Sequence, residues 1–538
     1  MKKLSIILLT ITVMSCTRKV SVDSMVINAN IYTVNDSFDI AHAFAIKDGK
    51  IIDVGTTLEI QSKYASTFIN DANGKTVIPG FIDAHCHFFG LGLQQQKVDL
   101  TGTKSFDEVL QKIIAFQKEK NVSYITGRGW DQNDWEIKEF PTKEKLDELF
   151  PNIPVSITRI DGHALLANQA AINLAEVTIN TPFSGGEILQ KNKKLTGIFI
   201  DNPMELIESK IPSPSKSAQI QALKDAEKIC VNYGLTTVDD AGLSREAIEL
   251  IDSLQNSGEL KIRIYAMVSN ITKDVNYYLS KGIVKTNRLN VRSIKVYGDG
   301  ALGSRGAAMK QPYSDKHNHF GALLATPEEY LTIAKQIAAS DYQMNSHAIG
   351  DSANYLLLKT YKDVLKGKTD RRWRIEHAQI IDKEDFKYFD NILPSVQPTH
   401  ATSDMYWAKD RIGAERMKGA YAYKDLLNKY GKIALGTDFP VEKVSPFLTF
   451  YAAVARKDLN NYPEEGFQME NALTREETLK GMTIWAAYSN FEENEKGSIE
   501  IGKLADFIVL DKNIMEVAAE KIPYIQVEET YIGGERIK

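Results

Sequence analysis

The chain has 538 residues, of which 43% are hydrophobic and 25% are charged, an ordinary composition for a globular protein. Its 70 acidic and 65 basic residues give a net charge of −5, which argues against a nucleic-acid partner. On length alone, the chain is enough for about three domains and can bury a large core.

The first segment has the pattern of an export signal. Lys2 and Lys3 precede an apolar run over residues 4–13 that is too short to span a membrane. Its ending resembles a bacterial lipoprotein signal, in which Cys16 becomes the lipidated N-terminus, although Met14 departs from the commonest pattern. We predict a signal peptide over residues 1–16 and an exported lipoprotein of the bacterial cell envelope, in the periplasm or outer membrane. The alternative is a simple signal peptide with an incidental Cys16.

The rest of the N-terminal region and the C-terminus are both predicted to be β-structure. Strand residues flank Asp48-Gly49, which is a hairpin signal, and Gly533-Gly534 marks a second hairpin. Neither end has enough apolar faces to be stable alone. We therefore expect residues 22–76 and 497–538 to pair into one small β-sandwich.

Two histidines, His85 and His87, stand at the end of the apolar run over residues 77–87. Side chains alternate between the faces of a strand, so these two imidazoles point the same way. Together they can bind one divalent metal. The alternative for an isolated pair is two structural histidines at a junction between strand and loop.

Three later strand-like runs also end in a residue that can bind a metal. These runs are residues 343–347 with His347, residues 373–377 with His377, and residues 433–438 with Asp438. Helical patterns lie between them, and a (β/α)8 barrel carries its catalytic residues at the C-terminal ends of its strands. Four histidines and an aspartate at such equivalent positions predict a shared metal site.

The predicted fold is an α/β, TIM-type (β/α)8 barrel over residues 77–496. Residues 150–217 interrupt the alternation of strand and helix, and we expect an insertion there that helps to cover the barrel mouth. Further candidate strands are residues 122–127, 235–239, 262–268, 293–297 and 394–397.

Motifs spread along nearly the whole chain resemble the amidohydrolase superfamily of metal-dependent hydrolases, and within it the YtcJ-like (amidohydrolase 3) branch. They are residues 77–87, Asp161-Gly162-His163, residues 295–305, residues 347–351, Glu376-His377-Ala378, residues 436–441 and residues 502–507. The resemblance implies a barrel beside a β-sandwich and a hydrolytic reaction, but it names no substrate.

We expect His85, His87 and Asp438 to hold one divalent cation, most simply zinc, and His347 and His377 to hold a second. Lys295 lies between apolar neighbours, where a charged lysine is costly to bury, so it should be neutral or modified. The resemblance implies that Lys295 is carboxylated and bridges two metals. The alternative is a lysine paired with a carboxylate such as Asp299.

The reaction expected is hydrolysis of a non-peptide carbon–nitrogen bond, such as that of an N-acyl or N-formyl amine, by water that the metal activates. Asp438 is suited to accept the proton of that water and to pass it to the leaving nitrogen. An ester or lactone hydrolase, or a deaminase, could use the same site. A different class of protein, a non-catalytic envelope binding protein on the same scaffold, would be indicated by a missing ligand, and none is missing.

Three further residues are candidates for substrate contact. The resemblance places His163 near the substrate, with a catalytic role also open, while His400 follows the seventh candidate strand. Arg305 lies in a glycine-rich loop and could bind an anionic group, although each of the three could instead stabilise its loop. The partners expected are a small-molecule substrate and, through Cys16, a membrane; a homodimer stays open.

Overall fold

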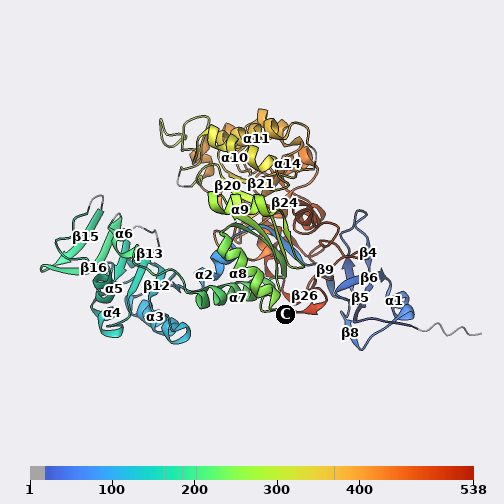
Figure 1. The fold of residues 1–538 in the computed structure, drawn as a ribbon, viewed down its shortest axis with the longest axis horizontal. Helices are drawn as coiled ribbons and strands as arrows, with labels where there is room; N and C mark the ends of the chain where they lie inside the picture. Colours follow the sequence, from blue (N-terminus) through green and yellow to red (C-terminus); the bar gives the residue numbers. More distant parts are fainter. Residues whose placement is uncertain are drawn as a thin grey trace, which may run out of the picture. The chain divides into compact units, whose positions relative to one another are not determined.

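The computed structural model describes residues 19–538 apart from Asp161, His163, Ser184, Gly185, Asn202, Ser304 and Thr369 (Figure 1). The predicted signal peptide, Cys16 and His163 therefore lie outside the described residues. Two compact units are formed, one by the chain up to His87 together with Ile229–Lys538, and the other by Phe88–Lys228. Within the described residues, no helix has the length and apolar character needed to cross a bilayer.

Eight parallel strands of the first unit form a nearly closed barrel, which confirms the predicted fold class. In sheet order they are β10 (Phe81–Cys86), β17 (Leu235–Leu243), β18 (Arg263–Ser269), β20 (Leu289–Tyr297), β21 (Gln343–Ala348), β22 (Arg374–His377), β23 (Leu393–Val396) and β24 (Ala434–Leu435). The residues after β24 return to the first strand, where the Asp438 amide donates to the His85 carbonyl at 2.8 Å. The amide of His87 likewise donates to the Phe439 carbonyl at 2.8 Å, so the two edges meet beside the predicted ligands.

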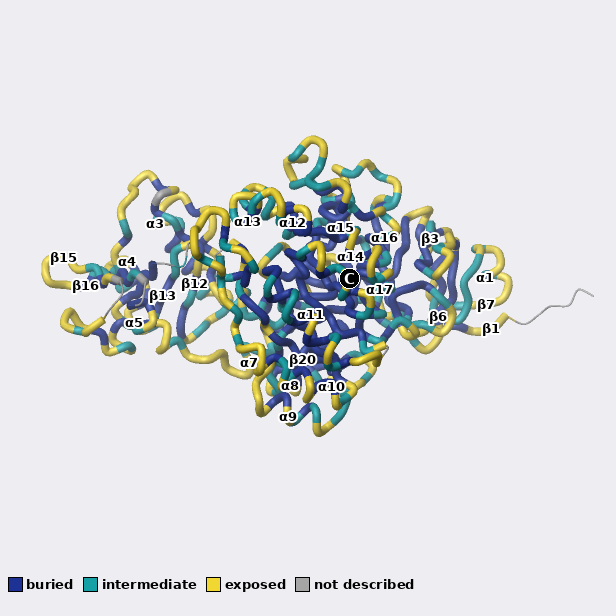
Figure 2. The backbone as a smooth tube through the Cα atoms, turned by 90° about the horizontal axis from the view of Figure 1, so that it is seen from above, coloured by how far each residue is buried: buried dark blue, intermediate teal, exposed yellow. Residues whose placement is uncertain are grey.

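Amphipathic helices cover the barrel, and their starts are specified by local sequence. In α10 (Pro327–Ala338), Thr326 and Glu329 form a capping box and Pro327 occupies the first turn. Helix α8 (Arg245–Asn256) is capped by Ser244 and buries one apolar face. Other helices of this unit are α9 (Thr272–Lys281), α11 (Asp351–Leu365), α12 (Pro398–Asp404), α13 (Ala408–Met417), α14 (Tyr423–Tyr430), α15 (Pro446–Ala455), α16 (Arg475–Gly481) and α17 (Ile484–Ser489). The burial colours of Figure 2 place the buried backbone at the barrel centre and the exposed backbone mostly at its periphery.

The terminal segments share one sheet, as the sequence predicts. Strand β25 (Phe507–Leu510) pairs antiparallel with β9 (Thr76–Pro79) and with β26 (Val527–Ile532), and β9 pairs parallel with β3 (Asn30–Tyr32). A second sheet has the order β6 (Lys50–Gly55), β5 (Ala43–Lys47), β2 (Ser24–Ile27) and β8 (Phe68–Asp71). The two sheets bury a common apolar core, in which the rings of Phe44 and Phe507 meet edge to face at 5.0 Å.

The second unit has a six-stranded sheet of its own. Its order is β11 (Val98–Asp99), β12 (Ile125–Trp130), β13 (Val155–Arg159), β14 (Ala164–Ala167), β16 (Lys194–Asp201) and β15 (Gly186–Lys191). Helices α3 (Phe106–Lys120), α4 (Glu144–Leu149), α5 (Gln169–Leu174) and α6 (Met204–Glu208) accompany it. The segment predicted as an insertion, residues 150–217, lies within this unit, which begins earlier, at Phe88. The assignment of residues 122–127 to the barrel is wrong, because this segment leads into β12 of the smaller sheet.

Candidate metal centre

The barrel brings the predicted ligands to one end. His85 is the penultimate residue of β10, and His347 is the penultimate residue of β21. His377 ends β22, and Asp438 follows β24. The C-terminal ends of parallel barrel strands meet at one face, so side chains far apart in sequence converge there. Donor atoms of His85, His87 and Asp438 all lie within 4.8 Å of one another, which is close enough to bind one cation.

A second group of donors shares Asp438. It consists of His377, His400 and Asp438, whose donor atoms also lie within 4.8 Å of one another. His400 comes from α12, directly after β23, and its ring stacks on that of His377 at 5.8 Å between centroids. The sequence predicted His347 as the partner of His377, and these two rings are 4.5 Å apart. In the structure Nε2 of His347 is 3.5 Å from Oδ1 of Asp299.

Hydrogen bonds at Nδ1 orient three of the histidines. Nδ1 of His85 contacts Oε2 of Glu376 at 2.7 Å, and Nδ1 of His377 contacts Oε1 of Gln397 at 2.7 Å. Nδ1 of His87 is 3.0 Å from the carbonyl oxygen of Ala241. Each partner is an acceptor, so Nδ1 carries the proton and Nε2 is the nitrogen that can bind a metal.

The backbone at the ligands is held in uncommon conformations. His377 has φ of 72° and Asp438 has φ of 63°, in the left-handed region that non-glycine residues rarely occupy. The turn that carries Asp438 is tied down by Asp83, which accepts hydrogen bonds from the Thr437 amide at 3.0 Å and the Thr437 hydroxyl at 2.7 Å. Such strained positions persist where surrounding contacts fix them, and they cluster at functional sites.

Burial and mutual repulsion keep most of the imidazoles neutral, which is the form that binds metals. Burial, reinforced by Lys295, lowers the pKa of His85 and lowers that of His347 to about 3. Burial and the neighbouring His347 lower the pKa of His377 far below its ordinary value. His87 differs: burial would lower its pKa, but its hydrogen bond to Asp438 and the charge of that carboxylate together raise it.

Lys295 and Asp438 differ in how the centre affects their ionisation: it favours the neutral amine of Lys295 and the charged carboxylate of Asp438. Burial lowers the pKa of the fully buried Lys295 amine to about 8, and its Nζ lies 3.2 Å from Nε2 of His85. Burial alone would raise the pKa of Asp438, but the hydrogen bond from His87 and the nearby histidines hold it well below its ordinary range. A carboxylate and a readily deprotonated amine therefore face the same space.

The donors present fit a divalent metal. Among the described residues, Nε2 of His400 is buried without a hydrogen-bond partner and lies 3.6 Å from Oδ2 of Asp438. Nε2 of His347 is likewise unpaired, but it lies 3.5 Å from Oδ1 of Asp299 and is in neither donor group. Buried polar atoms are almost always satisfied, so the unpaired His400 nitrogen within a group of donors fits a bound cation. Imidazole nitrogens with a carboxylate are a donor set that suits zinc and other divalent transition metals.

Two residues at the centre were not assigned a role from the sequence. Glu376 is fully buried and supports His85, while the half-exposed Tyr297 places its ring 5.9 Å from that of His347. Both belong to motifs that the sequence already singled out, and Tyr297 follows Lys295 on the same face of β20. That alternation was the available signal for Tyr297, whereas the contact of Glu376 with His85 joins residues 291 positions apart.

Arg305 has a partner within its own region of the chain. Its Nε and Nη2 donate to the carboxylate of Asp315 at 3.0 and 2.8 Å, so both atoms of the guanidinium fork are engaged. The role predicted for it, binding an anionic group of the substrate, would require this ion pair to be exchanged. His163 lies outside the described residues.

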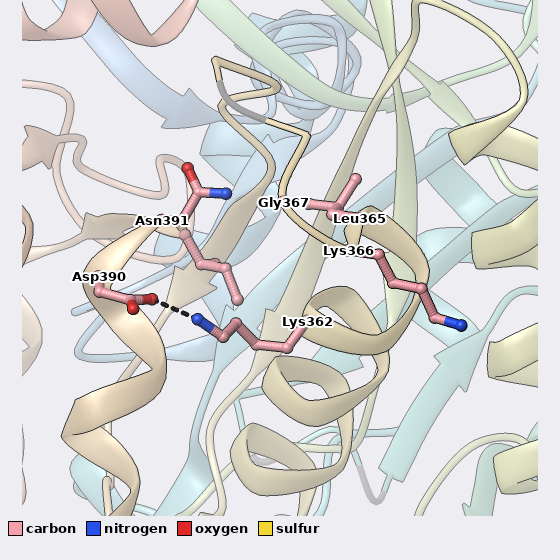
Figure 3. Close-up of a pocket in the computed structure, with 7 residues that line it drawn as sticks. Lys362, Leu365, Lys366, Gly367, Asp390 and Asn391 are labelled. Atoms are coloured by element: carbon pink, nitrogen blue, oxygen red, sulfur yellow. Dashed lines mark hydrogen bonds and ion pairs between the residues drawn. The ribbon is translucent and has the colours of Figure 1, made fainter.

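A separate cavity lies between α11 and the 3₁₀ helix over Lys383–Asp390, where Lys362 and Asp390 form an ion pair at 2.7 Å (Figure 3). Helix α11 follows β21 and ends toward the N-terminal face of the barrel. In barrel enzymes the N-terminal face contributes to stability, and the active site lies at the opposite face. None of the predicted site residues lines this cavity.

The sequence pattern of the Amidohydrolase family (Amidohydro_3) matches residues 69–537. The chain belongs to this family. It is 30% identical to YtcJ of Bacillus subtilis (strain 168), over 94% of this chain and 97% of that protein. It is 26% identical to an N-substituted formamide deformylase of Arthrobacter pascens, over 95% of this chain and 97% of that protein.

The family's fold is also matched in three dimensions. The crystal structure of an uncharacterized metal-dependent hydrolase from Pyrococcus horikoshii OT3 is 28% identical and has a TM-score of 0.77, covering 92% of this chain and 99% of that chain. The family match and the similarity to YtcJ confirm the predicted membership of the YtcJ-like amidohydrolases. The protein is a member of a family of metal-dependent hydrolases, with histidine and aspartate clusters that could hold the metal.

Proposed function

We propose that the protein hydrolyses a non-peptide carbon–nitrogen bond, such as the amide of an N-acyl or N-formyl amine. The observation that carries the proposal is the set of convergent donors His85, His87, His377, His400 and Asp438, three of whose Nε2 atoms are oriented by partners at Nδ1. Similarity to an N-substituted formamide deformylase along nearly the whole chain supports the bond type. The product set is a carboxylic acid, or formate, and an amine.

The residues present can carry the proton that this reaction moves. A divalent cation at the centre would act as a Lewis acid, making water more acidic and polarising the amide carbonyl. Water adds its oxygen to the carbonyl carbon, and the buried carboxylate of Asp438 accepts its proton. As the carbon–nitrogen bond breaks, the same proton passes from Asp438 to the leaving nitrogen.

Zinc and a modified Lys295 are the finer part of the proposal. Zinc is favoured by imidazole and carboxylate donors in a site of this kind. The lowered pKa of Lys295 makes its amine nucleophilic near neutral pH, so reaction with carbon dioxide would give a carbamate and release a proton. Such a carbamate would supply further oxygen donors beside His85, whose Nε2 lies 3.2 Å from Nζ of Lys295.

Metal analysis followed by a substrate screen tests the proposal. Elemental analysis of the purified protein, before and after reconstitution, should give one to two divalent ions per chain. The metal-loaded protein should release amine from some members of a matched panel of N-formyl and N-acetyl amines. Metal content well below one per chain after reconstitution, or a bound metal with hydrolysis confined to esters and lactones, would contradict it.

A further inference from the structure

A cavity of about 460 Å³ opens at the C-terminal ends of two neighbouring barrel strands, β18 and β20. Ser269 ends β18, Ile271 follows it, Tyr297 ends β20, and Leu324 precedes α10 on the remaining side. In a barrel of this type the C-terminal face is where substrates bind. The cavity is thus on the side of the barrel that carries the metal centre.

Tyr297 belongs to both the cavity and the metal centre. Its ring lies 5.9 Å from the ring of His347, and Nζ of Lys295 lies 5.2 Å from its centroid. Tyr297 also lines the cavity and is 42% exposed. A substrate whose amide is at the metal centre could therefore extend past Tyr297 into this cavity.

Three polar side chains of the wall are already engaged in hydrogen bonds within the protein. The Ser269 hydroxyl donates to the carbonyl of Gly242 at 2.6 Å. The Glu329 carboxylate accepts from the amide and the hydroxyl of its capping partner at 2.8 and 2.9 Å. The Tyr330 hydroxyl donates to the Gly298 carbonyl at 2.8 Å. Fixed hydrogen bonds leave these groups little capacity to bind a charged ligand.

Two large apolar side chains of the wall are exposed. Ile271 is 46% exposed and Leu324 is 62% exposed, and both border the same cavity as Tyr297. Large hydrophobic side chains gathered around one hollow mark a binding site more often than isolated ones do. An apolar group would cover both side chains and remove their surface from water.

We propose that this cavity receives an apolar substituent, aromatic or aliphatic, of the substrate amide. The inference rests on the proposed function and adds the class of substrate, a hydrophobic amide rather than a sugar or an amino acid with a charged side chain. The substituent could be on the amine side or on the acyl side of the bond, and probes of each kind distinguish them.

Binding to the metal-loaded full chain gives the first test. Calorimetric titrations would use N-formyl-2-phenylethylamine, with the phenyl group on the amine side, and N-methyl-3-phenylpropanamide, with it on the acyl side. Leu324→Lys places a charge in the cavity and should weaken at least one of them about tenfold or more, since apolar contacts of this size contribute roughly 10- to 200-fold. Leu58→Lys, on α1 (Thr57–Lys63) and 81% exposed, is the matched control and should bind like the wild type.

The outcomes separate this inference from the proposed function. Equal binding of both phenyl probes to the wild type and Leu324→Lys, or no binding of either probe to the wild type, overturns the cavity assignment. Loss of binding in Leu324→Lys alone supports it, whether or not amine is released. If the probes bind in the cavity but neither they nor the panel of small amides is hydrolysed, the proposed function fails while the assignment stands. For any hydrolysed probe, kcat/KM should fall in Leu324→Lys, whereas N-methylformamide should be unaffected.

Discussion

The His85 imidazole is held at both nitrogens, by Oε2 of Glu376 at 2.7 Å and by Nζ of Lys295 at 3.2 Å. The buried Glu376 carries a carboxylate whose pKa is low, because the effects of His85 and Arg374 outweigh its burial. A carboxylate behind a metal-binding histidine fixes its tautomer and makes it a stronger donor. Glu376 is therefore a positioning residue for the metal centre.

Replacing this carboxylate should weaken metal binding without removing a ligand. In Glu376→Gln the amide oxygen can still accept from Nδ1 of His85, but the negative charge is gone. We expect metal affinity to fall roughly 10- to 100-fold, measured by competition with a chelator. Gln397→Ala, which removes the neutral partner of His377, is the comparison and should have a smaller effect. Unchanged affinity in Glu376→Gln would show that the contact only fills space.

The role of Asp438 can be separated from simple ligation. Asn keeps the size and one oxygen donor but cannot take up a proton, so Asp438→Asn should lower turnover by roughly 10²- to 10⁴-fold on any substrate found. Its metal content should drop less than that of His85→Ala, which loses a nitrogen donor altogether. Near-normal turnover of metal-loaded Asp438→Asn would move the proton to another group, and His163 would be the next candidate.

Several residues of the centre were predictable because strand periodicity places them. His85 and His87 alternate with Cys86, and His347, His377 and Asp438 all end strand-like runs, so convergence follows from the barrel. His400 was expected only to line the pocket, because its approach to Asp438 depends on the turn that follows β23. The contact of Glu376 with His85 depends on strands far apart in sequence, and no local pattern reports it.

At the scale of elements, the sequence indicates that a strand exists more reliably than it indicates which sheet the strand joins. Residues 122–127 have the residue types of a strand, and β12 does form there. Its partners are β11 and β13 of the smaller unit, because pairing is decided by packing with distant segments. The hairpins at both ends of the chain were predictable from their Asp-Gly and Gly-Gly turns, which require positive φ.

A buried ion-pair cluster fastens the segment after α17 to the base of the barrel. Glu492 is bonded to Lys285 of β19 (Val284–Lys285) and lies 2.7 Å from Nζ of Lys496. Its side chain is 3% exposed. Burial opposes ionisation, but the two lysines lower its pKa to about 2 from an ordinary value of 4.5.

This cluster should make stability depend on pH in the acid range. A carboxyl group whose pKa is lowered by folding stabilises the native state above its unfolded pKa, and that contribution is lost as the pH falls through the folded value. A shift from 4.5 to about 2 corresponds to about 3 kcal/mol. We expect Glu492→Gln to lower the melting temperature at pH 7, with the gap to wild type narrowing between pH 4.5 and 2. Glu148→Gln, on the exposed side of α4, should show no such gap, and a pH-independent gap for Glu492→Gln would contradict this assignment.

At the scale of the whole molecule, the fold class follows from the alternation of strands and helices, and the family membership follows from motifs spread over the chain. The extent of the second unit does not, because its residues 88–228 contain β- and α-patterns of the same kind as the barrel. Where two sheets have the same local sequence patterns, only long-range contacts show which strands belong to which sheet. Function is specified in the same way, by a small set of residues that the barrel brings together.

The N-terminal segment carries the last prediction, which concerns where the whole chain resides. Residues 1–16 lie outside the described residues, so the expectation rests on Lys2, Lys3, the apolar run over 4–13 and Cys16. A chain with a net charge of −5 has no general attraction to anionic membranes, whereas a covalent lipid supplies about 0.8 kcal/mol per buried CH₂. Cys16→Ser should therefore move the protein from the membrane fraction to the soluble fraction, with the wild type retained after high-salt washing. Ser15→Ala, which keeps the thiol, should remain with the membrane. If Cys16→Ser stayed membrane-bound after the same washing, the anchor would have to lie elsewhere, and the lipoprotein assignment would be wrong.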